Sequence, residues 1–285
     1  MRVLVTGACG QLGTDLVQTC DAAGDEVIAC DRAEFDLTDR DAVYQAITTT
    51  QPDAVIHAGA WTAVDACESD PERAFLTNAL ATGWLADACR RVGAHLVAVS
   101  TDYVFDGTKS GPYQEWDLPN PQSVYGRSKL AGEHAVAAHA PGAAIVRTAW
   151  VCGAHGPNMV KTVLGLADRP ELVFVDDQRG CPTFTADLAP MLRRIAVERR
   201  AGTHHVTNQG DTTWHGFARD ILELAGHDPG KVRAIATADL DPPRAAPRPA
   251  NSVLDNAALR LGGLPLLPHY RDGLERLLRD LGALA

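Results

Sequence analysis

Short apolar runs alternate with longer amphipathic stretches along the first half of the chain. The runs lack the strict apolar–polar alternation of a half-exposed strand, so they predict strands buried on both faces of a sheet. They cover residues 3–6, 27–30, 54–58, 95–99 and 143–146. Helices are predicted between them at residues 12–20, 40–48, 72–92 and 125–138. Strands and helices in this order predict a parallel, doubly wound α/β sheet.

The regular pattern weakens in the second half, where glycine and proline recur and residues 241–249 form a proline-rich, extended loop. We interpret residues 1–148 as a dinucleotide-binding domain of Rossmann type. Residues 149–285 are then mainly a smaller substrate-binding lobe, interleaved with the last elements of the sheet. The aromatic side chains of Trp214 and Phe217 are predicted to belong to the core of this lobe.

Composition narrows the classes of partner. The 285 residues carry a formal net charge of −10, and no basic run is present, which disfavours nucleic acid and anionic membranes as partners. No apolar run reaches the roughly 18 residues of a membrane span. The chain starts with a predicted strand, without the layout of a secretion signal. Seven scattered cysteines indicate reduced core residues and a cytoplasmic location. The ten histidines lack metal-ligand spacing, so no metal site is predicted.

A glycine-rich turn connects the first predicted strand to the first helix. Gly7, Gly10 and Gly13 are spaced three apart, which allows a tight turn and lets backbone N–H groups approach a pyrophosphate at the helix N-terminus. Asp31 ends the second strand at the distance expected of an acid that meets the adenosine ribose. The sequence therefore predicts a dinucleotide site.

The residues after the second strand leave the cofactor open. The Asp31 carboxylate favours a free 2′-hydroxyl, whereas the guanidinium of Arg32 could hold a 2′-phosphate, so NADH and NADPH both remain possible. Asp36 and Leu37 stand where an adenine could rest. The alternative for this pair is a region that precedes a helix N-cap.

Tyr125 and Lys129 lie four residues apart on a predicted helix and hence on one face. A phenol can donate its proton to a carbonyl oxygen as hydride reaches the carbon, and a nearby ammonium stabilises the phenolate. Ser100 and Thr101 follow the fourth strand, where a hydroxyl can hydrogen-bond the substrate carbonyl. Strand alternation allows only one of these two hydroxyls to face the site.

These motifs resemble the extended short-chain dehydrogenase/reductases and, more narrowly, the family of dTDP-4-dehydrorhamnose reductases. The resemblance spans nearly the whole chain, through blocks at residues 7–13, 62–68, 100–107, 124–133, 147–151, 177–183 and 248–254. The first and fourth blocks are common to the superfamily. The blocks at residues 100–107 and 177–183 are much narrower signatures.

The resemblance implies roles for individual residues. Tyr125 would be the proton donor, and Lys129 would lower its pKa and contact the ribose. Thr101 would orient the C4 carbonyl, with Asp102 beside the sugar. Trp150 would pack against the nucleotide sugar, although core packing is the alternative from the sequence alone. The remaining cofactor contacts would be the pyrophosphate-binding residues Gly10, Gln11 and Leu12, and the residues Ala58, Ala60 and Thr62 on the path to the nicotinamide.

The implied activity is reduction of the C4 ketone of dTDP-4-dehydro-L-rhamnose by hydride from NADPH or NADH, which gives dTDP-L-rhamnose. One alternative is an epimerase or reductase for another nucleotide sugar. Another is a non-catalytic regulatory subunit resembling that of methionine adenosyltransferase. His57, Gly59 and Cys152 depart from the usual family pattern, which concerns the shape of the cofactor channel. A homodimer is the assembly to test, and the sequence does not fix whether a divalent ion lies between subunits.

Overall fold

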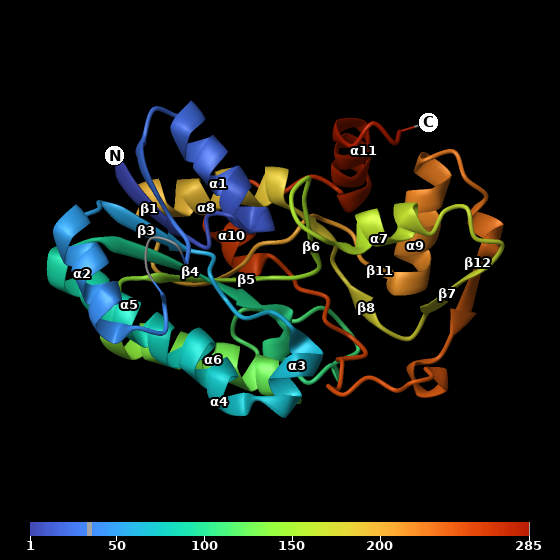
Figure 1. Ribbon diagram of the computed structural model, residues 1–285, viewed down its shortest axis with the longest axis horizontal. Coiled ribbons are helices and arrows are strands. Elements are labelled where there is room, and N and C mark those ends of the chain that lie inside the picture. The colour runs from blue at the N-terminus through green and yellow to red at the C-terminus, as the bar shows by residue number, and fades with distance from the viewer. Residues whose placement is uncertain (33–35, 285) are drawn as a thin grey trace.

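The computed structural model describes residues 1–32 and 36–284. Its centre is a six-stranded sheet in the order β10-β5-β4-β3-β1-β2, and every neighbouring pair in it is parallel (Figure 1). The strands are β1 (Arg2–Thr6), β2 (Glu26–Cys30), β3 (Ala54–His57), β4 (His95–Thr101), β5 (Ala144–Thr148) and β10 (Gly202–His205). The predicted α/β class with a doubly wound parallel sheet is confirmed.

Helices cover both faces of the sheet, as the uninterrupted apolar strands require. One core packs α1, α8 and α10 against the sheet, and Leu16 and Leu192 are fully buried in it. The other core packs α2, α5 and α6 on the opposite face, around Val55 and Leu85. These helices are α1 (Gln11–Ala22), α2 (Arg40–Thr50), α5 (Ala81–Val92), α6 (Val124–His139), α8 (Thr185–Val197) and α10 (Ala257–Leu261).

The helix predicted over residues 72–92 is interrupted. It consists of α4 (Pro71–Phe75), one π-helical turn η1 (Leu76–Leu80) and α5, and it follows the short helix α3 (Val64–Ser69). Asn78 in the π turn binds both polar groups of the Trp61 backbone, with its Oδ1 2.8 Å from the amide and its Nδ2 3.1 Å from the carbonyl. Such turns are frequent at functional sites. Here Leu76 and Thr77 of the same turn line the large cavity described below.

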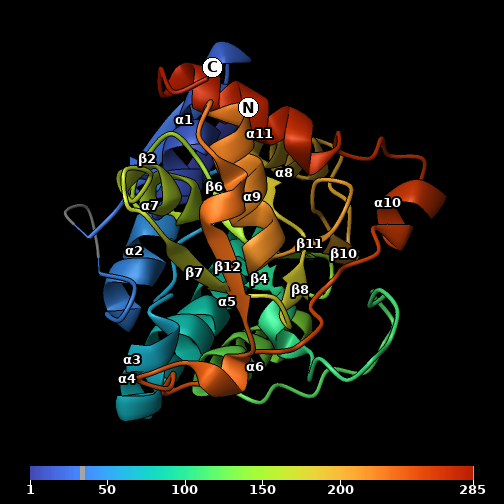
Figure 2. The same cartoon turned by 90° about the vertical axis from the view of Figure 1, so that its right-hand side faces the viewer.

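The second lobe packs three helices beside short paired strands (Figure 2). The helices are α7 (Met159–Gly165), α9 (Trp214–Leu224) and α11 (Tyr270–Asp280). The strand pairs are β6 (Val151–Cys152) with β9 (Thr183–Phe184), β7 (Leu172–Val175) with β12 (Val232–Ile235), and β8 (Arg179–Gly180) with β11 (Thr212–Thr213). The described residues also form the 3₁₀ turns η2 (Asp102–Val104), η3 (Pro229–Lys231) and η4 (Thr237–Asp239).

The second half of the chain contributes elements to the central sheet and its core. α8, β10 and α10 come from the second half of the sequence but pack in or on the central sheet. The division at residue 148 stays a prediction. In the described part of the chain, no helix combines the length and the apolar character needed to cross a membrane.

Candidate active site

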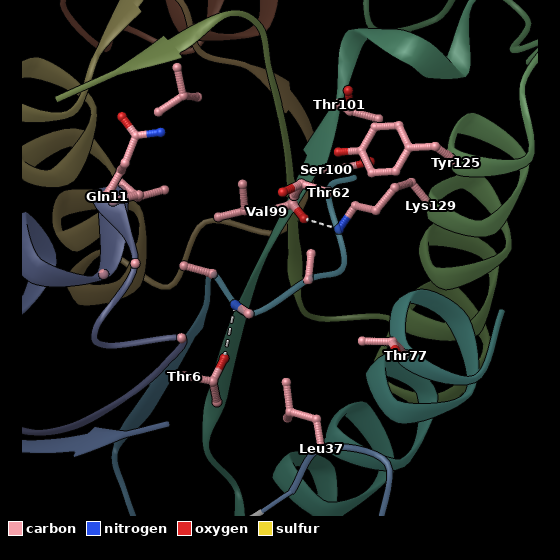
Figure 3. Close-up of a pocket in the computed structure, with 18 of the residues that line it drawn as sticks. Thr6, Gln11, Leu37, Thr62, Thr77, Val99, Ser100, Thr101, Tyr125 and Lys129 are labelled. Atoms are coloured by element: carbon pink, nitrogen blue, oxygen red, sulfur yellow. Dashed lines mark hydrogen bonds between the residues drawn. The ribbon is translucent and has the colours of Figure 1, made fainter. Parts of the chain in front are cut away.

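A cavity of about 1000 Å³ opens at the carboxyl ends of the parallel strands, beside the second lobe. Open α/β sheets bind ligands at this edge, where neighbouring crossovers leave on opposite faces. The cavity contacts every residue that the sequence singled out as a site residue. These are Gly7, Gly10, Gln11, Leu12, Gly13, Asp31, Arg32, Asp36, Leu37, Ala58, Ala60, Thr62, Thr101, Asp102, Tyr125, Lys129 and Trp150. Figure 3 shows Gln11 across the cavity from Tyr125 and Lys129.

The glycine loop is packed too tightly for side chains. A Cβ on Gly13 would lie 1.9 Å from the carbonyl oxygen of Gly7, and Gly7 itself has a left-handed φ of 68°. The N–H of Gly10 closes the turn by donating to the Gly7 carbonyl at 3.0 Å. Helix α1 has no side-chain cap, so the N–H groups of Gln11 and Leu12 remain at its positive end to receive an anion. The loop therefore fits a pyrophosphate.

The Gln11 side chain does not take part in the pyrophosphate site and instead connects the two lobes. Its Oε1 accepts hydrogen bonds from the Gly153 amide at 3.2 Å and from Asn158 Nδ2 at 2.9 Å. Asn158 also caps α7 through the Lys161 amide. The cofactor loop and the first helix of the second lobe are thus held together by one side chain.

Asp31 is fixed against the glycine loop. Its carboxylate accepts hydrogen bonds from the amide of Cys9 at 3.0 Å and from the amide of Arg32 at 2.8 Å. Burial acts to raise the pKa of this carboxyl, but the amide bonds and the Arg32 charge outweigh it and lower the pKa. An ionised acid in this position suits a ribose hydroxyl, and the exposed Arg32 beside it also lines the cavity.

Asp36 and Leu37 lie both at the cavity, where an adenine could rest, and just before a helix N-cap, so the two alternatives from the sequence are compatible. Both line the cavity, while Asp39 just beyond them is the N-cap of α2 and accepts from two of its amides. Leu37 packs over Gly59, where a Cβ would lie 2.8 Å from its Cδ1. The unusual glycine therefore makes room for this leucine. His57, the other departure in this segment, is buried between the hydroxyls of Thr6 and Thr82, at 2.7 and 3.1 Å.

Helix α6 presents Tyr125 and Lys129 at the far end of the cavity. Ser123 caps its N-terminus through the Gly126 amide at 3.1 Å, so the tyrosine lies in the first turn. The Tyr125 ring packs edge-on against Tyr103, with centroids 5.6 Å apart. The Lys129 ammonium donates to the Val99 carbonyl at 2.7 Å.

The end of β4 assigns separate tasks to its two hydroxyls. Ser100 Oγ donates to Glu133 Oε1 at 2.6 Å, in a buried contact. Thr101 faces Tyr125, and its side chain acts to lower the pKa of the phenol, while its hydroxyl donates to Asp102 Oδ1 at 3.0 Å. Both residues line the cavity, but the Ser100 hydroxyl is bound to Glu133, so Thr101 is the one that can serve the reaction site.

Burial perturbs the titratable groups of the site. It raises the pKa of Tyr125 against the opposing contact with Thr101, so the phenol carries its proton at neutral pH. Burial lowers the pKa of Lys129 to about 8, against the opposing charge of Glu133. It also raises the pKa of Asp102 to about 6. The groups that act on Tyr125 do not include Lys129, so the role of this lysine in lowering the tyrosine pKa stays a prediction.

The substrate end of the cavity is aromatic. Trp150 has a left-handed φ of 47°, unusual for a residue with a side chain, and its ring stacks on Trp214 at 3.5 Å and 6°. A Cβ on Gly180 would lie 2.5 Å from the Trp150 ring, which explains this glycine in the block at residues 177–183. Trp214 lines the cavity and is only half-buried, so its prediction as a core residue was incomplete. Phe217 is fully buried, as predicted.

Two polar atoms at this end lack partners. Oδ2 of Asp102 and Oγ1 of Thr148 are buried, and neither has a hydrogen bond within the described ranges. Both residues line the cavity, at the ends of adjacent strands. Because buried polar atoms are normally satisfied, these two are available to bind a polar ligand in the cavity.

Sequence reasoning missed an ion pair that joins α3 to the proline-rich loop. The Asp65 carboxylate on α3 binds both terminal nitrogens of Arg248, at 2.5 and 2.8 Å. Glu68 on the same helix accepts from the amide of Val124, which begins α6, at 2.7 Å. Asp65 and Arg248 belong to two of the blocks that carried the family resemblance. Because 183 positions separate them, no local sequence pattern could pair them.

Comparisons with known proteins agree on one family. The family model described as the RmlD substrate binding domain matches residues 1–283. A dTDP-4-dehydrorhamnose reductase of Streptomyces griseus is 45% identical over 280 residues, covering 96% of this chain and 91% of that protein. A dTDP-4-keto-6-deoxy-D-glucose reductase of Streptomyces niveus is 38% identical over 284 residues, covering 99% and 98%.

Solved structures give the same result. The crystal structure of a dTDP-4-dehydrorhamnose reductase from Clostridium acetobutylicum has a TM-score of 0.95 at 41% identity, covering 99% of this chain and 100% of that one. The Bacillus anthracis reductase in complex with NADP has a TM-score of 0.94 at 37% identity, covering 98% and 99%. The Thermus thermophilus UDP-glucose 4-epimerase in complex with NAD shares the fold, with a TM-score of 0.83 at 24% identity and full coverage of both chains.

Proposed function

The chain belongs to the RmlD substrate-binding-domain family, and from this premise we propose that it is an NAD(P)H-dependent oxidoreductase that reduces the C4 ketone of dTDP-4-dehydro-L-rhamnose to dTDP-L-rhamnose. The observation that carries the proposal is the cavity that joins a glycine-loop pyrophosphate site to the Thr101–Tyr125–Lys129 set. A dedicated regulatory subunit would need the first of these features but not the second.

One end of the cavity fits the cofactor. The Gln11 and Leu12 amides would bind the pyrophosphate, Asp31 would meet the adenosine ribose, and Leu37 would contact the adenine. Ala58, Ala60 and Thr62 would line the path to the nicotinamide. The reduced nicotinamide, when bound, supplies the hydride.

The opposite end of the cavity would supply the proton for the substrate oxygen. Thr101 would hold the carbonyl oxygen of the substrate near Tyr125, whose raised pKa keeps a proton available for that oxygen. The ammonium of Lys129 would stabilise the phenolate that remains and would contact the ribose. A protonated phenol next to a buried cation is a suitable general acid for a forming alkoxide.

The sugar would lie between Trp150 and Asp102. The stacked rings of Trp150 and Trp214 would offer an apolar surface to the sugar, and the oxygens of Asp102 and Thr148 would accept hydrogen bonds from its hydroxyl groups. Interactions with the remote nucleotide can orient the ketone, because binding energy away from the reacting carbon is available for positioning.

Cofactor preference and assembly also follow as proposals. Asp31 and Arg32 side by side fit either NADH or NADPH, and the NADP complex of the Bacillus anthracis reductase favours NADPH as the first cofactor to test. The small-molecule partner is a nucleotide sugar. A homodimer and a cytoplasmic location remain predictions from the sequence.

The test is oxidation of NADPH and NADH with a panel of thymidine, guanosine and uridine diphosphate keto-sugars. The proposal expects turnover with dTDP-4-dehydro-L-rhamnose and stoichiometric formation of dTDP-L-rhamnose. Tightly retained NAD that is recycled without net oxidation would instead identify an epimerase. Absence of turnover with every keto-sugar, together with co-purification of an enzyme partner, would identify a regulatory subunit.

A further inference from the structure

A buried ion pair behind the site joins three of the sequence blocks. Glu133 on α6 and Arg147 on β5 form it, with 2.7 Å between Oε2 and one terminal nitrogen and 2.9 Å between Oε1 and Nε. Their side chains are only 6% and 5% exposed. Ser100 at the end of β4 donates to the same Oε1 at 2.6 Å. Neither charge touches the large cavity, so the proposed chemistry does not use them directly.

The pair lies directly below the reacting groups. Tyr125, Lys129 and Glu133 follow at intervals of four residues and therefore lie along one face of α6. Lys129, Glu133 and Ser100 also line one small void of about 10 Å³. Glu133, one turn further along α6, is consequently the carboxylate that faces the buried ammonium of Lys129.

Few other charges face Lys129. Tyr125 precedes it on α6 and keeps its proton, because burial raises its pKa. His57 on β3 is neutral, since burial lowers its pKa to about 3. From β4 the lysine meets the Val99 carbonyl, and Arg147 on β5 is bound to the far side of Glu133. Among the described residues, Glu133 alone acts to raise the pKa of Lys129, against burial.

Glu133 also anchors the end of β4. Its Oε1 holds the Ser100 hydroxyl at 2.6 Å, and the next residue along the strand is Thr101. The guanidinium of Arg147 on β5 holds the Glu133 carboxylate in place. The Phe105 ring in turn packs over this guanidinium, with its centroid 5.1 Å from Arg147 Cζ.

We propose that Glu133, clamped by Arg147, is a positioning residue for the reduction: it keeps Lys129 cationic and, through Ser100, fixes the end of β4 that carries Thr101. The inference rests on the proposed function, because it assigns a task within that reaction. Glu133 touches neither cofactor nor substrate, and it acts through Lys129 and Ser100.

The direct test measures the titration of Lys129. The chain has only four lysines, at positions 109, 129, 161 and 231, so ¹³C-labelled lysine gives few NMR signals, and Lys129→Arg assigns the one of interest. The double variant Glu133→Gln/Arg147→Met removes both charges together and avoids leaving one of them buried alone. The pKa of Lys129 should fall by about one unit, a tenfold change in its protonation equilibrium.

The matched control is Asp25→Asn. Asp25 is 4% exposed, precedes β2 away from the cavity, and pairs with Arg193 at 2.6 Å and with the N-terminal amine at 3.1 Å. Its variant should leave the Lys129 titration unchanged. An unshifted Lys129 in a folded double variant, or an equal shift in the control, would overturn the proposal. If the double variant does not fold, Glu133→Gln alone tests the same coupling, because its amide oxygen still accepts from Ser100. The Lys129 pKa should then fall at least as far, because the Arg147 cation is left without its counter-charge.

A second arm separates positioning from charge. Ser100→Ala removes the anchor of β4 and leaves the charge of Glu133, so kcat should fall about tenfold to a hundredfold while the Lys129 titration and the affinity for NADPH stay unchanged. An unchanged kcat would refute the positioning of Thr101. If the wild-type protein reduces no keto-sugar, the proposed function fails, whereas the NMR arm still tests the coupling of Glu133 to Lys129.

Discussion

Gly13→Ala tests the cofactor site at its most constrained position. The new Cβ would lie 1.9 Å from the Gly7 carbonyl oxygen, 2.7 Å from the Gly7 carbonyl carbon and 2.8 Å from the Ala8 Cα. All three neighbours belong to the backbone, so no side-chain rotation relieves the overlap. The loop must move by about 1 Å or more away from α1, since non-bonded carbon contacts lie near 3.5–4 Å.

The displacement should affect both folding and cofactor binding. Overpacking of this kind costs roughly 1–3 kcal/mol of stability. Moving the loop also separates the Gln11 and Leu12 amides from the pyrophosphate, and losing one hydrogen bond to a charged group costs about 1.5–3 kcal/mol, or about tenfold to a hundredfold in affinity. Calorimetric titration with NADPH measures the affinity, and thermal unfolding measures the stability.

Gly142→Ala is the matched control, because a Cβ there meets no atom within 4 Å. It should bind NADPH with wild-type affinity. Wild-type affinity in the Gly13→Ala variant as well would refute the assignment of this loop as the pyrophosphate site.

Three further outcomes are expected. Tyr125→Phe should lower kcat by about a hundredfold to ten-thousandfold with unchanged NADPH affinity, as measured by single-turnover kinetics; undiminished turnover would exclude Tyr125 as the proton donor. Trp214→Ala should raise KM for the dTDP-sugar about threefold to tenfold by releasing the Trp150 ring, with little change for NADPH, and an unchanged KM would argue against an aromatic substrate end. Burial lowers the pKa of His57 and of His205 to about 3, below the ordinary histidine pKa in the unfolded chain. The neutral forms of both histidines therefore favour the folded state above about pH 6.5. The free energy of unfolding decreases as the pH falls from there toward 3. Urea unfolding at about pH 7 and at about pH 5 should differ by about 2 kcal/mol for each histidine, and His57→Asn should remove one share of that difference; an unchanged difference would contradict this origin.

Most of the central sheet was predictable because its inner strands are buried on both faces and are therefore mainly apolar. The strands predicted at residues 3–6 and 27–30 match β1 and β2 closely. The sixth strand, β10, was not predicted, since Gly202–His205 reads as polar. His205 is nevertheless buried there, because its ring hydrogen-bonds the backbone carbonyls of Tyr113 and Asp255. Such partners are distant in sequence, so a local pattern cannot show them.

The candidate site was predictable where spacing carries the chemistry. The glycine loop and the Tyr125–Lys129 pair are local patterns, whose residues meet the cavity because of the strand or helix that bears them. Trp214 reaches the site only through the folding of the second lobe onto Trp150, and its position in the sequence resembles that of a core residue. The four-residue spacing from Lys129 to Glu133 was present in the sequence, but only the tertiary contact with Arg147 gives it meaning.

The central claim is that this cavity reduces a nucleotide-linked ketone with hydride from a nicotinamide cofactor. The most direct measurement follows oxidation of NADPH by the purified protein with dTDP-4-dehydro-L-rhamnose and identifies the product by NMR. We expect one equivalent of dTDP-L-rhamnose for each cofactor oxidised, and almost no product from the Tyr125→Phe variant. A folded protein that binds NADPH but oxidises neither NADPH nor NADH with this substrate would contradict the account.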